Sequence, residues 1–206
     1  MLTRVCCWES RHVPDLELGY LLAQILAGVL IADLVSGVVH WLEDAYGRED
    51  MPFIGPRVIE PNIRHHYSPL DFTKACYLKR NGPIFAIAAI TGLIFAFAGW
   101  LNPFTLTLLL VGSQANETHR WAHMPASAVP GIVRVLQKSG LLLSQRHHSK
   151  HHRPPFSARY CTVTNLVNPI ADGLKLFVII EQLIWGVAGV QRRQDTGQRP
   201  STVRGL

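Results

Sequence analysis

The chain has 206 residues, of which 48% are hydrophobic and only 17% are charged, and its formal net charge is +6. One domain is expected at this length. Such apolar bulk is unusual for a soluble domain and favours a membrane protein whose basic loops face anionic lipid. No basic helix interleaved with aromatic residues is present, so nucleic acid is not expected as a partner. The four cysteines lack Cys-x-x-Cys spacing and are expected to be mostly reduced; they are Cys6, Cys7, Cys76 and Cys161.

The first apolar run, Leu18–Val39, is long enough to cross a bilayer, which takes about 20 residues. Its helical pattern continues through Asp44, so His40 and Asp44 stand one turn apart, where one metal ion could bind both. The alternative for His40 is an interfacial histidine beside Trp41. Asp33 lies inside the apolar run, where an ionisable group is costly. We expect Asp33 to support the ligands from behind or to have a structural role.

The segment Gly47–Arg80 is rich in proline and charge and is expected to be a polar loop. Within it, His65 and His66 lie in the sequence Glu-Pro-Asn-Ile-Arg-His-His-Tyr-Ser-Pro. Because prolines restrict the backbone at both ends, the loop should be stiff and should present two ligands at little entropic cost. The alternative is a pair of loop histidines in solvent.

Gly82–Leu101 has twenty residues and no charge, which predicts a second membrane-crossing helix. An Asn-Pro pair breaks it, and Pro103–Asn116 is expected to open the returning arm of a membrane hairpin. That arm continues into His119 and His123, which again stand one turn apart. Asn116, just before this pair, is expected to hold a metal-bound water behind the ligands.

The run Arg146–His152 reads Arg-His-His-Ser-Lys-His-His and contains four of the ten histidines. If this run is helical, His147 and His151 share one face, and His148 and His152 share another. Neutral imidazoles so close together suit a transition metal. The alternative is a solvated basic patch or an adventitious metal-binding run, since a histidine-rich run is only compositional information.

The remaining segments are expected to support the site. Ala128–Ser144 mixes apolar and basic residues and predicts an interfacial helix, with core packing as the alternative. Phe156–Pro169 is expected to be irregular. Leu174–Val190 is apolar but contains charge, and we favour a helix in the interface or packed under the site. The domain assignment is therefore an N-terminal segment at 1–17, a membrane domain at 18–190 and a loose basic tail at 191–206.

The basic residues predict the topology. No Lys or Arg lies between Gly19 and Leu42 or between Asn81 and His119, whereas Glu43–Arg80 holds six and Arg120–Tyr160 holds seven. Both basic regions should therefore face the cytoplasm. The histidines from four separate segments are then expected to converge on one cytoplasmic face.

The expected ligands and catalytic residues form one pool. It consists of His40, Asp44, His65, His66, His119, His123, His147, His148, His151 and His152. Imidazoles with one or two carboxylates fit iron, manganese or zinc. Their number exceeds the roughly four ligands of one zinc site, so two metal ions are expected. A site of this kind at a membrane boundary favours O2 activation on a lipid, because di-iron can take hydrogen from an unactivated C–H bond and no side chain can.

Several ordered motifs resemble the Kua family, whose animal members are plasmanylethanolamine desaturases. The resemblance runs from about Asp33 to Gly189 and includes these residues: Asp33-Leu-Val-Ser36-Gly37-Val-Val-His40-Trp41-Leu-Glu-Asp44-Ala-Tyr-Gly47, Arg64-His65-His66, Asn116-Glu-Thr-His119-Arg-Trp121-Ala-His123, His147-His148-Ser-Lys-His151-His152, Cys161, Asn168 and Glu181-Gln-Leu-Ile-Trp-Gly186-Val-Ala-Gly189. It implies an all-α integral membrane protein with three to four transmembrane or interfacial helices and a di-metal site on the cytosolic face.

The resemblance also implies a reaction. Two iron ions and O2 would place a double bond between the first two carbons of an ether-linked alkyl chain on a membrane phospholipid. An external donor such as cytochrome b5 or ferredoxin would supply the electrons, in a bacterial inner membrane or one of the endoplasmic reticulum type. Plant members similar to this chain desaturate the acyl chain of phosphatidylglycerol, and the motifs do not separate the two substrates.

Two alternatives remain open from the residues. One is an acyl-lipid desaturase or hydroxylase with the same metal centre. The other is a metal-binding membrane protein such as a transporter or sensor. A transporter should place its ligands along a path at mid-membrane, whereas these are expected at helix ends on one side.

Overall fold

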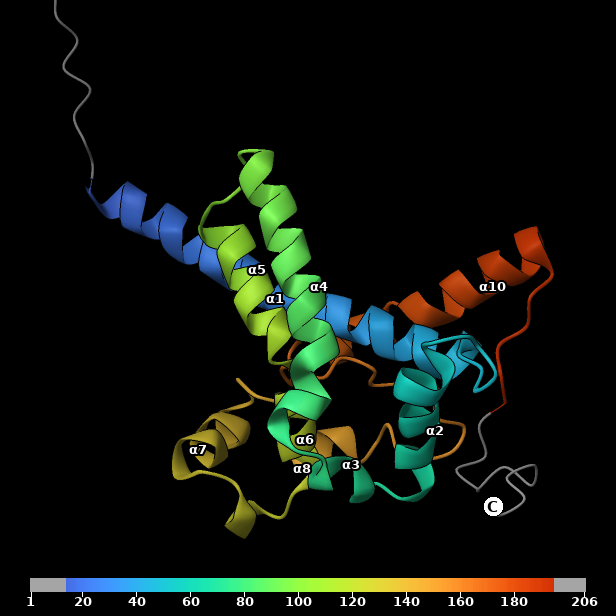
Figure 1. Ribbon diagram of the computed structural model, residues 1–206. Coiled ribbons are helices and arrows are strands. Elements are labelled where there is room, and N and C mark those ends of the chain that lie inside the picture. Colours follow the sequence, from blue (N-terminus) through green and yellow to red (C-terminus); the bar gives the residue numbers. More distant parts are fainter. Residues whose placement is uncertain (1–13, 195–206) are drawn as a thin grey trace, which may run out of the picture.

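The structure, a computed structural model, describes residues 14–194, and within that range the chain forms helices and connecting segments without strands (Figure 1). The longest helix, α1 (Pro14–Tyr46), runs diagonally through the molecule, and α4 (Tyr77–Phe97) and α5 (Pro103–Ser113) form a hairpin against it. The other helices are η1 (Gly55–Ile59, a π-helix), α2 (Glu60–Tyr67), α3 (Asp71–Lys74), α6 (Ala115–His123), η2 (Ala126–Ala128, a 3-10 turn), α7 (Gly131–Ser139), α8 (Gln145–His148), α9 (Val167–Gly173) and α10 (Leu176–Ala188). In Figure 1, α2, α3, α6, α7 and α8 gather below α1, whereas α10 points away from them.

Between residues 14 and 194, two helices are long and apolar enough to cross a membrane, namely Leu16–Tyr46 within α1 and Tyr77–Phe97. Within the protein, only 22% and 6% of their most apolar stretches are buried. Side chains such as Leu93 and Ile94 are 60% and 56% exposed. Apolar surface of this extent requires a lipid or protein covering. The expectation of an all-helical membrane protein is thus confirmed, and α1 continues past Asp44 as its sequence predicts.

The returning arm of the hairpin is shorter than the sequence suggested. A capping box starts α5: the Asn102 side chain accepts from the Thr105 N–H at 3.1 Å, and the Thr105 hydroxyl accepts from the Asn102 N–H at 3.0 Å. However, α5 has 11 residues, or about 16 Å, and ends at Ser113. It therefore does not cross a hydrocarbon layer of about 30 Å by itself.

The expectation of a polar loop over Gly47–Arg80 is wrong for much of that segment. It contains η1, α2, α3 and the first turn of α4. Pro56 and Pro61 lie in the first turns of η1 and α2, where a proline removes no intrahelical hydrogen bond. His65 and His66 are therefore presented by the last turn of a helix and not by a stiff loop.

The C-terminal elements close one end of the molecule. Phe156–Leu166 is irregular, as expected, but the expected range ran to Pro169, and its last three residues instead form the start of α9. After α9 comes α10, in which Val187 and Leu183 are 89% and 61% exposed. With 13 residues, α10 is about 20 Å long, short of a membrane span. The expected loose tail is anchored near its start, since the Arg193 N–H donates to the carbonyl of Ala45 at 2.6 Å. The rest of that tail, 195–206, and residues 1–13 lie outside the described part of the chain.

A small apolar core fixes the end of α1. Its buried members come from α1, the irregular segment, α9 and α10: Trp41, Ala45, Tyr160, Ala171 and Phe177. The indole N–H of Trp41 donates to Glu181 at 2.8 Å, which ties α10 to α1. Because His40 and Asp44 lie on this same stretch of α1, the core holds two candidate ligands in place.

Candidate metal centre

Eight of the ten histidines converge beneath the C-terminal half of α1. They come from four separate segments: His40 on α1, His65 and His66 on α2, His119 and His123 on α6, and His148, His151 and His152 on α8 and the turn after it. All except His152 are buried, and His152 is partly buried. The sequence therefore predicted the convergence of these segments correctly.

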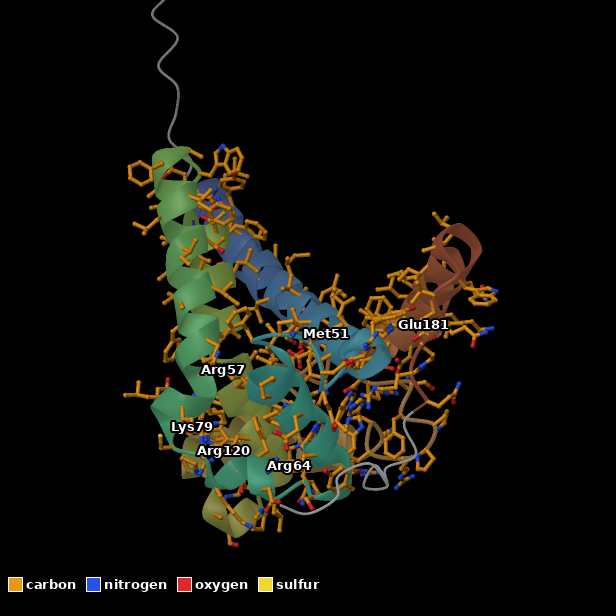
Figure 2. All side chains as sticks on the ribbon, turned by 45° about the vertical axis from the view of Figure 1, so that its right-hand side comes forward. Met51, Arg57, Arg64, Lys79, Arg120 and Glu181 are labelled. Atoms are coloured by element: carbon orange, nitrogen blue, oxygen red, sulfur yellow. The ribbon has the colours of Figure 1, made fainter. Side chains whose placement is uncertain are left out.

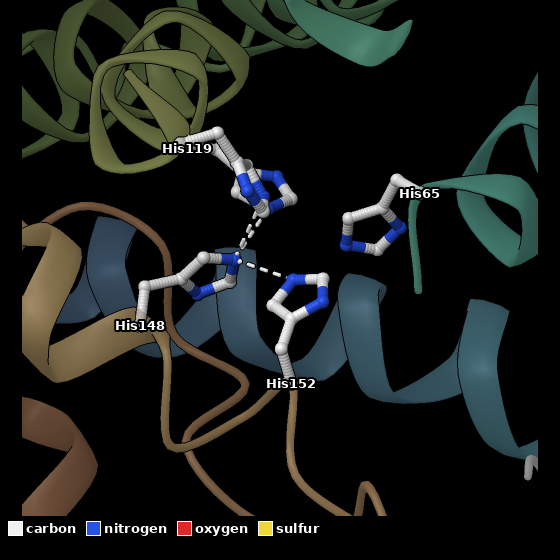
Figure 3. A group of neighbouring side chains, drawn as sticks. His65, His119, His148 and His152 are labelled. Atoms are coloured by element: carbon white, nitrogen blue, oxygen red, sulfur yellow. Dashed lines mark hydrogen bonds between the residues drawn. The ribbon is translucent and has the colours of Figure 1, made fainter. Parts of the chain in front are cut away.

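The first histidine group consists of His65, His119, His123, His148 and His152, whose candidate ligand atoms all lie within 4.8 Å of one another. The Nε2 atom of His148 lies 2.8 Å from that of His119 and 3.1 Å from that of His152. Figure 3 shows these rings turned toward one another from three sides. Nitrogens bound to one ion at about 2.1 Å and at right angles are about 3 Å apart. The spacing of these rings thus fits a shared metal ion.

The second histidine group consists of His40, His65, His66 and His151, again with ligand atoms within 4.8 Å. The carboxylate of Asp44, 1% exposed, lies against it. Its oxygens lie 3.6 Å from His40 Nε2, 3.5 Å from His66 Nε2 and 3.3 Å from His151 Nε2. His65 belongs to both groups, so the two candidate metal positions share a neighbour.

Backbone carbonyls orient several of these rings. The Nδ1–H groups of His40 and His151 donate to the carbonyls of Tyr160 and Ala158 at 3.0 and 2.9 Å. The ring of His65 is held in the same way by the carbonyl of Asn62. A donor on Nδ1 leaves the lone pair of Nε2 free for a metal.

Unsatisfied polar atoms support a metal at this place. His40 Nε2, His65 Nε2 and Asp44 Oδ2 are buried and have no hydrogen-bond partner within the described chain. Buried polar atoms are rarely left unpaired in native proteins. These three atoms are all acceptors that point into the second histidine group. A cation would satisfy them together, so the residues present fit a metal ion.

Four histidines outside α1 are held neutral by their surroundings. Burial, followed by the neighbouring imidazoles, lowers the pKa of His65, His119 and His148 well below the usual value, and lowers the pKa of His123 to about 3. A neutral imidazole is the form that binds a metal. These four imidazoles are therefore ready to bind a metal at neutral pH without a prior loss of protons.

Aromatic rings cover the cluster on several sides. The ring of Phe72 lies 5.0 Å from that of His119, and the ring of Phe156 stacks on His66 at 5.2 Å. Tyr160 lies 5.2 Å from His151. Sequence reasoning missed these three residues, because no motif marks a side chain that only covers a ligand. Their rings reduce the access of water to the site.

The contacts of Asp33 fit the structural role that was one of its two expected roles. Its buried carboxylate accepts from the Val163 N–H at 2.8 Å and from the Thr164 hydroxyl at 2.5 Å. One turn further on, Gly37 allows close packing, since a Cβ there would lie 2.5 Å from the sulfur of Cys161. The irregular segment therefore lies directly along α1, and its backbone reaches the ligands.

Two other expected site residues lie outside the histidine groups. The Nε2 atom of His147 accepts from Arg159 at 3.1 Å, and burial, followed by the charge of Arg159, lowers the pKa of His147 to about 4. Asn116 donates to the carbonyl of Arg80 at 2.9 Å, which joins α6 to α4. Beside it, Glu117 pairs with Arg80 and Arg120, a buried charge network that sequence reasoning did not identify.

Together these features define a class: all-helical proteins with membrane-length helices and two overlapping groups of buried histidines beside them. Within that class, the chain belongs to the lipid desaturase family, whose domain model matches residues 29–195. Membership makes it an oxidoreductase of the desaturase type and confirms the family resemblance found in the motifs.

Three relatives illustrate the range of the family. Plasmanylethanolamine desaturase 1 of Mus musculus is 30% identical over 91% of this chain and 71% of its own length, and the plasmanylethanolamine desaturase of Myxococcus xanthus is 32% identical over 85% and 64%. The chloroplastic fatty acid desaturase 4 of Arabidopsis thaliana is 33% identical over 81% and 52%. The chain thus spans between about half and about seven-tenths of these relatives. No solved structure matches it.

Proposed function

We propose that this chain is a membrane di-iron lipid desaturase that acts on an alkyl ether glycerophospholipid and forms a vinyl ether between the first two carbons of the ether-linked chain. The observation that carries the proposal is the pair of overlapping ligand groups, eight imidazoles and one carboxylate, beside membrane-length helices. The mouse and Myxococcus relatives, both plasmanylethanolamine desaturases, support the ether-lipid substrate.

The ligands divide into two sets. His119, His123, His148 and His152 would hold one iron; His40, Asp44, His66 and His151 would hold the other, and His65 lies between them. His147 is left out because its Nε2 atom accepts from Arg159. Two iron ions bound there would supply the capacity to activate O2 and to take hydrogen from an unactivated C–H bond.

The other residues position the ligands and exclude water. Carbonyls of Tyr160 and Ala158 fix the rings of His40 and His151, so that Nε2 stays directed inward. The rings around the site limit unproductive loss of the oxidant to solvent. In the whole reaction the substrate loses two hydrogens, O2 accepts them with two electrons and two protons, and two water molecules form. A donor such as cytochrome b5 or ferredoxin supplies the electrons.

We place the site on the cytoplasmic side of a bacterial inner membrane or a membrane of the endoplasmic reticulum type. The six basic residues of Glu43–Arg80 and the seven of Arg120–Tyr160 support this orientation, because basic loops stay preferentially in the cytoplasm. The histidines lie within these two regions or at the adjoining helix ends.

The alternative substrate is an acyl chain, acted on by the same metal centre as a desaturase or hydroxylase. The chloroplastic fatty acid desaturase relatives favour it, since their identity of 33 to 34% is slightly above the 30 to 32% of the plasmanylethanolamine desaturases. A non-enzymatic metal carrier fits less well, because its ligands should follow a path through the membrane.

Metal content and lipid products test the proposal together. The chain would be purified in detergent for elemental mass spectrometry and expressed in cells supplied with alkyl ether lipid. About two irons per chain with new acid-labile vinyl ether would support the ether-lipid desaturase. Iron without vinyl ether but with a new acyl alkene would favour the alternative substrate. Failure to bind iron, even after reconstitution of zinc-loaded protein, would refute the di-iron centre.

A further inference from the structure

The segment Met51–Arg57 exposes apolar side chains without an evident reason in water. Phe53 is 79% exposed and Ile54 is 50% exposed. The backbone of Phe53 has a φ of 64°, in the left-handed region that a bulky residue rarely adopts. The aromatic ring thus makes few contacts within the protein, although its backbone is held in an unfavourable conformation. Such a side chain fits a surface that another apolar phase covers.

The position of this segment relative to α4 indicates that the covering apolar phase is the bilayer. In Figure 2, Met51 lies level with Glu181 of α10, above Lys79 in the first turn of α4, and Arg57 lies between Met51 and Lys79. Lys79 and Arg80 are the last charged residues before α4 becomes apolar. The segment therefore lies where α4 would pass from the head groups into the hydrocarbon.

Other elements also expose apolar side chains. On the end of α1 that precedes the segment, Val39 and Leu42 are 49% and 44% exposed, and on α10 Leu183 is 61% exposed. Phe53 and Ile54 extend this surface. One lipid layer can then cover the exposed apolar side chains of all three elements at once. A single small protein contact would cover only part of them.

Charge in the segment complements lipid phosphate. Arg57 is exposed and forms no ion pair with any residue between 14 and 194, whereas Arg48 is neutralised by Asp50 at 2.5 Å. A basic side chain next to inserted apolar residues is typical of a membrane contact, since its stem lies on the apolar layer and its charge meets the phosphates.

We propose that Met51–Arg57 is a bilayer contact, with Phe53 and Ile54 among the lipid chains and Arg57 on a lipid phosphate. The contact does not depend on the proposed reaction. It does lie close to the site in the chain, because η1 leads directly into α2, whose last turn presents His65 and His66. The lipid held there would therefore adjoin a helix that presents two candidate ligands.

Spin labelling tests the contact without turnover or metal. The full chain, with Cys6, Cys7 and Cys76 changed to Ser, would carry a nitroxide at Phe53→Cys in nanodiscs of phosphatidylcholine and phosphatidylglycerol. Buried Cys161 would stay. Power saturation compares access of O2, which concentrates in lipid, with access of a water-soluble nickel chelate. We expect O2 to dominate at position 53.

Two labels provide the references. Leu93→Cys reports the lipid-facing side of α4, and Leu70→Cys, 56% exposed before α3, reports the side of the metal centre. A label at 53 with the same O2 and nickel access as the label at 70 would overturn the proposal. That result would also be the one expected if another protein, and not lipid, covered Phe53. Adding Arg57→Glu should lower the ratio of O2 to nickel access at 53 about twofold. An unchanged ratio would overturn the role of Arg57.

Discussion

Replacement of Asp33 by alanine tests whether the irregular segment depends on α1. The carboxylate is fully buried and accepts two hydrogen bonds, from the Val163 N–H at 2.8 Å and the Thr164 hydroxyl at 2.5 Å. Asp33→Ala removes both and leaves the Val163 N–H and Thr164 hydroxyl buried without this acceptor. The segment that follows Tyr160 would then be free to leave α1, together with the carbonyl that orients His40.

The expected cost follows from these two bonds. A hydrogen bond to a charged group contributes about 1.5–3 kcal/mol, so the loss of two such bonds in Asp33→Ala should lower the free energy of unfolding by about 3–6 kcal/mol. Asp33→Asn keeps one acceptor for the Val163 N–H, and the Thr164 hydroxyl can turn to accept, so we expect a loss of only about 1–2 kcal/mol. Ser36→Ala is the matched control, because the Ser36 hydroxyl accepts a single bond from the Thr162 N–H at 3.0 Å, worth about 1 kcal/mol.

Denaturant titration in detergent would give the free energies of unfolding, and elemental mass spectrometry on the same samples would give iron per chain. If Asp33 is a structural anchor, iron should be lost in step with the folded fraction. Equal stability of Asp33→Ala and Ser36→Ala would refute the anchor. Loss of iron from a variant of normal stability would instead show that Asp33 acts on the ligands directly.

Three further predictions use matched pairs or one titration. His148→Ala should lose most bound iron and all activity, whereas His147→Ala should retain iron, because of these two residues only His148 lies in a histidine group. Equal iron content in both variants, measured by elemental mass spectrometry, would contradict the ligand assignment. Glu117→Ala should lower the free energy of unfolding by about 3–5 kcal/mol, because it leaves the buried charge of Arg80 without its partner. Asp50→Ala, which breaks an exposed ion pair, should lower it by at most about 1 kcal/mol. Similar losses for both variants in denaturant titration would argue against the buried network. In the metal-free protein, folding lowers the pKa of His123 from 6.5 to about 3, so the unfolded chain binds a proton that the folded chain excludes. Stability should therefore fall as the pH drops below about 6.5, by up to about 1.4 kcal/mol per pH unit, and His123→Ala should flatten the slope of the thermal midpoint between pH 7 and 5; an unchanged slope would contradict the assignment.

The membrane helices could be predicted because their cause is local. A helix in lipid needs apolar side chains all around over about 20 residues, and both Leu18–Val39 and Gly82–Leu101 show this directly. The helical nature of Gly47–Arg80 could not be read in the same way. Its prolines suggested a loop, yet Pro56 and Pro61 lie in first turns, where they favour a helix start. Position within the element decides the effect of a proline, and composition does not give that position.

The irregular segment shows a different limit. It has neither helical nor strand periodicity, because it is fixed by partners far away in the sequence, Asp33 with Val163 and Gly37 with Cys161. It orients two ligand rings through backbone carbonyls, those of Ala158 and Tyr160, which any residue would supply. Side-chain motifs carry no signal for such a role. Asp33 alone gave a sign of it, as a costly charge inside an apolar run.

The histidine box combines a correct prediction with a wrong geometry. Helical spacing would pair His147 with His151 and His148 with His152, but α8 ends at His148 and a turn follows. His148 and His152 still meet at 3.1 Å, whereas His151 lies 3.2 Å from His66 in the second histidine group. A continuous helix would have kept all four side chains on one surface. Because of the turn, the segment His148–His152 supplies ligands to both histidine groups. The spacing between the two candidate metal positions therefore depends on the backbone between His148 and His151 and on His65, which both groups share.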